Sequence, residues 1–259
     1  SLSSTDGSII NQTEVYRASG SNNARAGKQA SIESTGDLKV NAAKDITNLG
    51  AKMSAGGDAS LAAGGDVTFD TVEETTYSGS SSSGGNIFVR TSTTESSRST
   101  KQVKSGLTSG GNLSVKAKND VTLAGTDVEA KGSVALEAGG DINLIARENT
   151  TSTNKTTTKK GLFVSGGLYG TEKVTTDTFS SKNVGTSIKA GKEISLVSGK
   201  TLTSQAAEVT AGDSIDINVE FFKDLAVNDV ERTTTKTETS SVLSINLLGE
   251  RSYKAKAAA

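Results

Sequence analysis

One stretch of the sequence, residues 36–69, returns twice further along the chain. A shift of 75 positions lays it on residues 111–144 without a gap. A third copy follows after another 81 positions, where Ile194 falls on Leu113. Recurrence at a long period is typical of architectures in which one structural unit stacks on the next. This repeat therefore limits the fold class more than any other feature of the sequence.

Within each copy, apolar and polar residues alternate over three positions, as at 38–40 and 67–69. Alternation with period two indicates short strands that bury one face. The strands recur 21 residues apart, from Leu38 to Ala59 and in a second series from Ile46. A coil of that length, made of short strands and Gly, Asp or Asn corners, suits a solenoid with apolar ladders inside. The sequence therefore predicts an all-β fold, a right-handed parallel β-helix with Ser/Thr-rich β-hairpin insertions.

The composition fits a thin, repetitive core, since 33% of the residues are hydrophobic and 4% are aromatic. We expect residues 1–259 to form a single elongated repeat domain. Because the chain begins and ends inside a repeat, we also expect it to be a segment of a longer protein. The expected units are about 31–105, 106–185 and 186–259, preceded by the end of a truncated unit at 1–30, with insertions at about 70–105, 145–185 and 228–259.

The insertions are rich in Ser and Thr, yet they repeat as well. The apolar triplet at 87–89 matches those at 162–164 and 245–247. Thr favours strands, so each insertion is interpreted as an outgoing strand, a Gly-rich apolar segment and a returning strand. The expected structure is a β-hairpin or small sheet projecting from the side of the β-helix. The alternative is a mobile Ser/Thr loop.

Gly-Gly-Asp corners recur before the strands, for example at residues 64–66 and 139–141. Calcium-binding nonapeptide rolls also use Gly-Gly and Asp, but their motif continues with a second half that is missing here. The preferred interpretation is a corner in which Gly takes a positive φ and Asp caps the turn.

The charges and the missing residue types exclude several functions. The net charge of −1, with both signs interspersed, gives no basic stripe and argues against nucleic acid as a partner. Without His or Cys, the usual catalytic triads and His- or Cys-based metal sites cannot form. The corner carboxylates recur in every copy, whereas an active site is normally unique. We therefore expect no enzyme, no catalytic residue, no metal site and no cofactor. The corner carboxylates that recur in this way are Asp45, Asp66, Asp120 and Asp141.

The aromatic residues are concentrated in the insertions, and only Phe69 occupies a repeated strand position. Aromatic side chains on exposed β elements mark binding or membrane-facing surfaces. Phe88, Phe163 and Tyr169 are therefore the candidate residues for contact with a membrane or a partner. The alternative is that they fasten the insertions to the flank of the β-helix.

Three features carry a family resemblance: the Ala-Gly-Gly-Asp corner within 138–144, the AGTDVEAKGSV motif within 124–134, and the Thr-rich insertion after Arg147 and Glu148. They resemble the haemagglutinin repeats of filamentous-haemagglutinin-like two-partner secretion exoproteins. The chain is most similar to the second haemagglutinin-repeat region of the effectors of contact-dependent growth inhibition.

The resemblance implies a stalk-like protein of a Gram-negative bacterium, secreted or held at the cell surface by a two-partner outer-membrane transporter. For the second repeat region it also implies association with the target cell's outer membrane, where a C-terminal toxin is carried across. The implied partners are that membrane, the transporter and the rest of the exoprotein, including its toxin domain. The alternative function is a passive fibre or adhesin stalk that displays protein- or glycan-binding surfaces.

Overall fold

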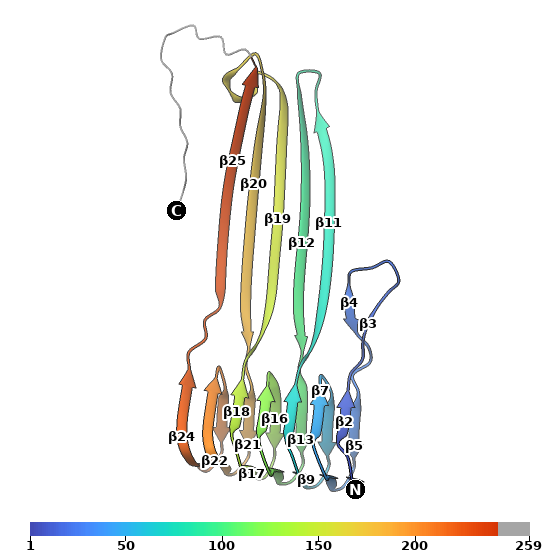
Figure 1. Ribbon diagram of the computed structural model, residues 1–259, viewed down its shortest axis with the longest axis vertical. Helices are drawn as coiled ribbons and strands as arrows, with labels where there is room; N and C mark the ends of the chain where they lie inside the picture. The colour runs from blue at the N-terminus through green and yellow to red at the C-terminus, as the bar shows by residue number, and fades with distance from the viewer. Residues whose placement is uncertain (243–259) are drawn as a thin grey trace. The chain divides into compact units, whose positions relative to one another are not determined.

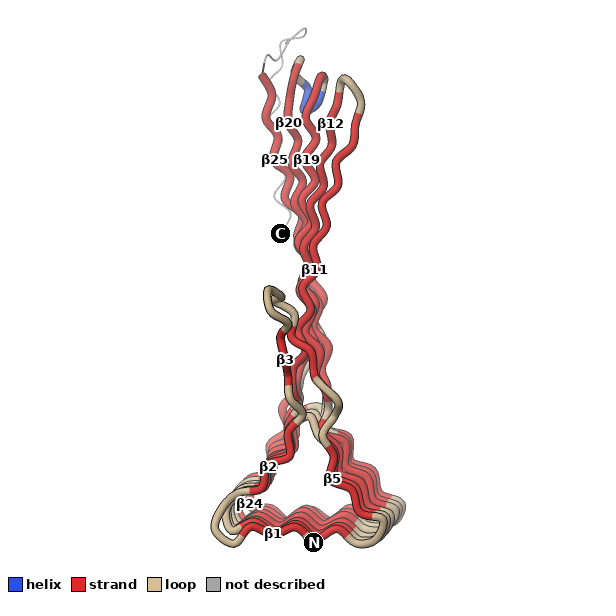
Figure 2. Tube along the Cα trace, turned by 90° about the vertical axis from the view of Figure 1, so that its right-hand side faces the viewer, coloured by secondary structure: helices blue, strands red, loops and turns tan. Residues whose placement is uncertain are grey.

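The computed structural model describes residues 1–242, which form two compact units (Figures 1 and 2). The first, called the β-helix unit, comprises Ser1–Thr75, Thr100–Asn149 and Lys182–Asp229. The second, called the hairpin unit, comprises Thr76–Ser99, Thr150–Ser181 and, of the residues that follow, 230–242. The predicted triplet at 245–247 and the rest of the third insertion beyond residue 242 lie outside the described residues. The predicted organisation as one domain of three units stays a prediction.

Each coil of the β-helix unit has three faces, and Figure 2 shows its triangular cross-section. Face one contains β1 (Leu2–Ser4), β6 (Leu38–Ala42), β9 (Ala59–Ala63), β14 (Leu113–Ala117), β17 (Val134–Ala138) and the first halves of β22 (Ile194–Gln205) and β24 (Ile215–Leu225). Face two contains β2 (Ile9–Gln12), β7 (Ile46–Leu49), β10 (Val67–Asp70), β15 (Val121–Ala124), β18 (Ile142–Ile145) and the second halves of β22 and β24. Face three contains β5 (Ser31–Ser34), β8 (Lys52–Ala55), β13 (Ser105–Ser109), β16 (Thr126–Ala130), β21 (Ser187–Ala190) and β23 (Glu208–Ala211).

The pairing confirms the parallel β-helix and its 21-residue coil. Leu38 pairs with Ala59 in parallel strands, and Ile46 pairs with Val67. The copies also stack as the sequence alignment predicts, because Val67 pairs in turn with Val121. Equivalent residues of successive coils therefore form continuous ladders.

The core of the β-helix unit consists of the inward-facing residues of all three faces. Face two contributes a ladder in which Asn48, Phe69 and Leu123 follow one another in successive coils, each fully buried. Burying an aliphatic or aromatic side chain of this size contributes about 1.5–3 kcal/mol relative to exposing it. Each coil adds only a few such residues, so cohesion depends on stacking between coils rather than on a central globular core.

The Asp corners form two hydrogen-bonded ladders that run from coil to coil. In each, a backbone N–H donates to the side-chain oxygen of the equivalent residue one coil earlier. One ladder has donors Asp58, Asn112 and Ser133, at 2.9, 2.7 and 3.0 Å. The other has donors Asp66, Asp120, Asp141 and Thr201, at 2.9, 3.1, 2.7 and 3.0 Å. The carboxylates thus cap the turns of the β-helix, as the corner interpretation requires.

The prediction of positive φ at the Gly-Gly-Asp corners is wrong. None of these glycines is among the residues with positive φ, whereas Gly50 and Gly125 at another corner are. The corner glycines are required by close approach instead. A Cβ on Gly139 would lie 2.2 Å from the Lys118 carbonyl oxygen, and one on Gly140 would lie 2.2 Å from Asp120 Oδ1. Each glycine of the pair therefore accommodates a different oxygen of the preceding coil.

Gly140→Ala should destabilise the fold by about 1–3 kcal/mol, because the new methyl group overlaps the Asp120 carboxylate. The measurement is the urea unfolding midpoint followed by circular dichroism. Gly84→Ala is the matched control, since a Cβ there meets nothing within 4 Å. Adding Asp120→Ala should give a double variant less destabilised than the sum of the single changes. Strict additivity would contradict the close-approach explanation.

The two insertions that the structure describes in full confirm the predicted β-hairpins and show that the mobile-loop alternative is wrong for them. All of the insertions leave between face two and face three, and they do so only in alternate coils (Figure 1). The predicted insertions contain β11 (Val72–Gly85) with β12 (Val89–Val103), β19 (Arg147–Leu162) with β20 (Tyr169–Val184), and β25 (Val230–Val242). A further short hairpin, β3 (Val15–Arg17) with β4 (Ala24–Ala26), lies within residues 1–30, for which no insertion was predicted.

The spacing of the coils explains why these hairpins pair with one another. Two coils span about 9.6 Å, since neighbouring strands lie about 4.8 Å apart, and the two strands of a hairpin span the same width. Successive long hairpins can therefore join edge to edge. The resulting sheet has the strand order β25-β20-β19-β12-β11-β4-β3, and Figure 1 shows its long strands running in alternating directions.

Candidate functional site

The strongest candidate site is a group of exposed apolar side chains at one end of the hairpin unit, here called the apolar tip. Figure 1 shows the turn between β11 and β12 and the loop between β19 and β20 at the same end of the sheet. Exposed fractions of the side chains there reach 90% in a sheet whose strands are otherwise polar. The members are Ile87 (90%), Phe88 (56%), Phe163 (76%), Leu168 (41%) and Tyr169 (52%).

The turn that carries Ile87 and Phe88 is fixed by one asparagine. Asn86 Oδ1 accepts hydrogen bonds from the backbone N–H groups of Phe88 at 2.9 Å and Val89 at 2.8 Å. The backbone N–H of Asn86 donates to the Val89 carbonyl oxygen at 2.9 Å. Asn is favoured in turns because its side chain makes such local bonds. Three hydrogen bonds therefore define the turn that exposes Ile87 and Phe88.

The loop that carries Phe163 is strained and tightly folded. Phe163 and Ser165 both adopt left-handed conformations, with φ of 61° and 62°, and the loop includes the short 3₁₀ helix η1 (Val164–Gly166). Such conformations are costly for residues other than Gly, and they persist where the surroundings enforce them. Ser165 Oγ donates to the Thr171 carbonyl oxygen at 2.9 Å, which closes the loop.

A hydrogen bond joins the two parts of the apolar tip, because the Leu162 N–H donates to the Phe88 carbonyl oxygen at 2.9 Å. Gly161 permits this approach, since a Cβ there would lie 2.1 Å from that same oxygen. The exposure of Phe88, Phe163 and Tyr169 is what a contact surface requires, and packing against another element would have buried them. Their role in contacting a membrane or partner stays a prediction.

Sequence reasoning missed Ile87 and Leu168, although each precedes a predicted aromatic residue in the chain. The available signal was local: both are aliphatic residues in insertions composed mainly of Ser, Thr and Gly. Their inclusion makes the apolar tip a continuous feature of two loops rather than three isolated aromatic residues.

Acidic residues of the hairpin unit near the apolar tip are already paired with lysines. Lys159 Nζ lies 3.6 Å from Glu172 Oε2, and Lys173 Nζ lies 3.5 Å from Glu238 Oε2. Glu238 also accepts a hydrogen bond from Lys236, and this bond and the neighbouring positive charges lower the pKa of Glu238. In both ion pairs the carboxylate balances the charge of its lysine locally.

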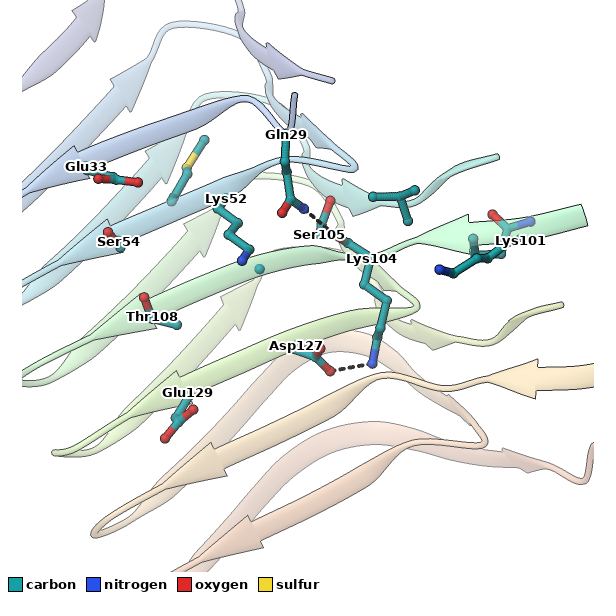
Figure 3. A pocket seen from close by; sticks show the side chains of 14 residues that line it. Gln29, Glu33, Lys52, Ser54, Lys101, Lys104, Ser105, Thr108, Asp127 and Glu129 are labelled. Carbon is teal, nitrogen blue, oxygen red and sulfur yellow. Dashed lines mark hydrogen bonds and ion pairs between the residues drawn. The ribbon is translucent and has the colours of Figure 1, made fainter. Parts of the chain in front are cut away.

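A second candidate is a groove of about 590 Å³ on the outer side of face three (Figure 3). Gly106 of β13 pairs with Lys52 of β8 on one side and with Asp127 of β16 on the other. Because Gly106 has no side chain, a recess is left between those two side chains. Lys104 forms an ion pair with Asp127, and Gln29 Nε2 donates to the Lys104 carbonyl oxygen at 2.9 Å. The groove's charged residues, three lysines and three acids, are Lys52, Lys101, Lys104, Glu33, Asp127 and Glu129.

The charged residues of the groove are balanced in number, so the groove does not select the sign of a ligand's charge. Within residues 1–242, no group of three or more acidic residues is placed to hold a metal ion. The corner carboxylates accept backbone hydrogen bonds instead, as described above. None of the helices in that part of the chain is long and apolar enough to cross a membrane.

Comparison with known proteins places these features in context. A family model described as the hemagglutinin repeat matches residues 3–96 and 88–242. The chain is 32% identical to a 16S rRNA endonuclease CdiA of Enterobacter cloacae subsp. cloacae, over 72% of this chain and 6% of that protein. It is 31% identical to a tRNA nuclease CdiA of Escherichia coli strain STEC_O31, over 73% of this chain and 6% of that protein.

A hemolysin of Proteus mirabilis is 26% identical over 82% of this chain and 13% of that protein. The chain thus spans only 6% to 13% of the length of these three relatives. The nuclease names describe proteins that this chain matches over a small repeat-bearing part, and they indicate no enzymatic activity for it. No solved structure matches the chain.

Proposed function

Because the chain belongs to the hemagglutinin-repeat family, as a repeat segment of a secreted exoprotein, we propose that it takes part in delivering a C-terminal toxin across the outer membrane of a target bacterium. In this role the segment is not an enzyme. It acts at the target-cell surface, and its partners are the target outer membrane, a two-partner secretion transporter and the rest of its own exoprotein. The β-helix unit supplies length, and the hairpin unit supplies the contact.

The observation that carries this proposal is the exposed apolar tip. A soluble protein rarely exposes five large apolar side chains in two adjoining turns unless they meet a partner or a membrane. Phe88, Phe163 and Tyr169 are the proposed membrane-contacting residues, together with Ile87 and Leu168. The strained backbone at Phe163 supports the same interpretation, since strain of this kind accumulates at functional sites.

The test uses the purified chain and vesicles made from Gram-negative outer-membrane lipid. We expect release of an entrapped dye, together with protection of residues 76–99 and 150–181 from added protease. Aromatic tips anchor at the interface, so protection should be strongest at the two turns. Dye release without protection would indicate surface disruption only. If the chain neither binds nor permeabilises the vesicles, the delivery proposal fails.

A second function, a passive fibre or adhesin, is favoured by the face-three groove. Its hydroxyl, carboxylate and ammonium groups can all hydrogen-bond a polar glycan or peptide. Binding of the chain to glycans or proteins of intact cells, with no effect on vesicles, would favour this function. Lys52→Ala should then weaken that binding, while a change in the apolar tip should leave it unaltered.

A further inference from the structure

Two basic residues lie directly opposite each other in the hairpin unit, one rung from the apolar tip. The register of β12 and β19 follows from three cross-strand contacts: Thr93 faces Thr157 at 3.3 Å, Ser97 faces Thr153 at 3.2 Å and Ser99 faces Thr151 at 3.3 Å. The hydrogen bond from Leu162 to Phe88 obeys the same register. Continued along the strands, this register sets Arg90 opposite Lys160, here called the basic pair.

Like charges placed directly opposite each other in a sheet destabilise it. Other cations near this end of the sheet avoid the problem by pairing with acids, as Lys159 does with Glu172. Within residues 1–242, neither Arg90 nor Lys160 forms an ion pair with a carboxylate. On the far side of Lys160, the register of β19 with β20 places Thr171, which is uncharged. The sheet therefore concentrates positive charge at one rung.

The basic pair lines a recess that is equipped for an anion. Arg90, Ser92, Thr158 and Lys160 surround a space of about 330 Å³. Because alternate residues of a strand share a face, all four side chains belong to the same side of the sheet. The two cations attract an anion, and the two hydroxyls below them can donate hydrogen bonds to its oxygens.

The order of the rungs gives the chemical class of the ligand. On this face, the row nearest the turns contains Phe88, Leu162 and Tyr169, as the two registers place them. The basic pair follows two residues further down each strand, which is about 7 Å. Interfacial elements bury their apolar side about 5–10 Å into the headgroup and acyl boundary. The distance between the apolar row and the basic pair therefore matches the depth to which an interfacial element buries its apolar side below the phosphate layer of a bilayer.

We propose that the basic pair, with Ser92 and Thr158, binds the phosphate headgroups of an anionic lipid bilayer while the apolar tip enters the acyl boundary. This inference rests on the proposed contact with a membrane and adds selectivity for anionic lipid. Binding should weaken as salt rises, because the phosphate contact is electrostatic and lies at the solvated interface.

The experiment measures association of the full chain with vesicles by flotation. One set contains phosphatidylcholine alone, and the other contains phosphatidylcholine and phosphatidylglycerol in equal parts. Native protein should prefer the anionic set. The double variant Arg90→Gln/Lys160→Gln should lose about 30-fold in affinity for that set, since each cation near an anionic surface contributes about 1 kcal/mol. Its affinity for phosphatidylcholine alone should be unchanged.

The control variant Lys155→Gln/Lys182→Gln removes the same total charge from two exposed lysines outside the recess. It should keep nearly all of the native preference. An equal loss in this control would show that general charge, not the basic pair, attracts the membrane, and would overturn the inference. Equal native binding to both vesicle sets would also overturn it, while leaving membrane contact intact. Native binding to neither set would remove the proposed function itself.

Discussion

Phe69→Ala should lower the free energy of unfolding by about 3–5 kcal/mol, and the loss of stability should be greatest in the middle of the β-helix unit. Phe69 is fully buried and is the largest such side chain of the described residues. Its neighbours in the ladder are Asn48 in the coil before and Leu123 in the coil after, so truncation leaves a cavity between two coils. Neither neighbour can fill it without breaking its own stacking.

The measurement is urea unfolding followed by circular dichroism, with amide hydrogen exchange to locate the change. Because each coil contacts only its neighbours, the loss of exchange protection should centre on β7, β10 and β15. Phe69→Leu should cost under about 1.5 kcal/mol, since Leu123 and Leu144 already occupy this position in later coils. Tyr16→Ala, at a side chain that is 56% exposed, should have almost no effect. A similar cost for all three variants would contradict the ladder.

Phe88→Ser/Phe163→Ser should reduce association with outer-membrane lipid vesicles about 100-fold. Each phenyl ring transferred from water contributes at least about 1.5 kcal/mol, and the rings lie in separate turns that can both reach the lipid. The fold should be unaffected, because both side chains are more than half exposed, at 56% and 76%. Flotation of the variant on vesicles, beside an unfolding curve, measures both quantities.

The chain offers a matched control for this change in Phe221 and Phe222 of β24, which are 63% and 58% exposed. Phe221→Ser/Phe222→Ser removes the same rings from the β-helix unit. This control should bind vesicles as the native chain does. If both double variants lost binding equally, exposed aromatic area in general would explain association, and the apolar tip would have no special part in it.

The coil could be predicted from sequence because its signal is strictly periodic. Leu38, Ala59 and Leu113 occupy equivalent positions in the repeats, and the structure stacks them in neighbouring strands. The insertions in alternate coils lengthen the step between neighbouring coils on every face, so these steps are recognised only by aligning whole repeats. Ile32 and Met53 are one coil apart in the chain, whereas Met53 and its next partner, Leu107, are separated by a whole hairpin.

Other features depend on contacts that no local pattern reveals. Asn48 is fully buried inside the apolar ladder, where its side chain accepts from Asn11 Nδ2 at 2.7 Å and donates to the Ala51 carbonyl oxygen at 2.7 Å. The requirement for Gly140 likewise comes from a carboxylate of the preceding coil. In both cases a residue of the preceding coil supplies a partner that is distant in the chain, Asn11 for Asn48 and Asp120 for Gly140.

The candidate site was predicted in part. The aromatic residues were visible as unusual members of polar insertions, and the structure finds Phe88, Phe163 and Tyr169 exposed. The basic pair was not visible, because the juxtaposition of Arg90 and Lys160 depends on the register between strands of different insertions. A sequence gives the charges of both residues, and only the pairing shows that they face each other.

Because hairpins leave only every second coil, two repeating structures stay in step. Each coil adds one strand to every face of the solenoid, and each hairpin adds two strands to the hairpin sheet. A whole repeat unit, two coils with one hairpin, can therefore be duplicated or lost while the number of strands added by the coils still matches the number added by the hairpins. Removal of a single insertion-free coil, such as residues 111–131, would bring the exits of two hairpins within about 4.8 Å, half the width that their strands need. We expect such a deletion to force one hairpin out of the sheet, whereas removal of two successive coils with their hairpin should leave the sheet paired.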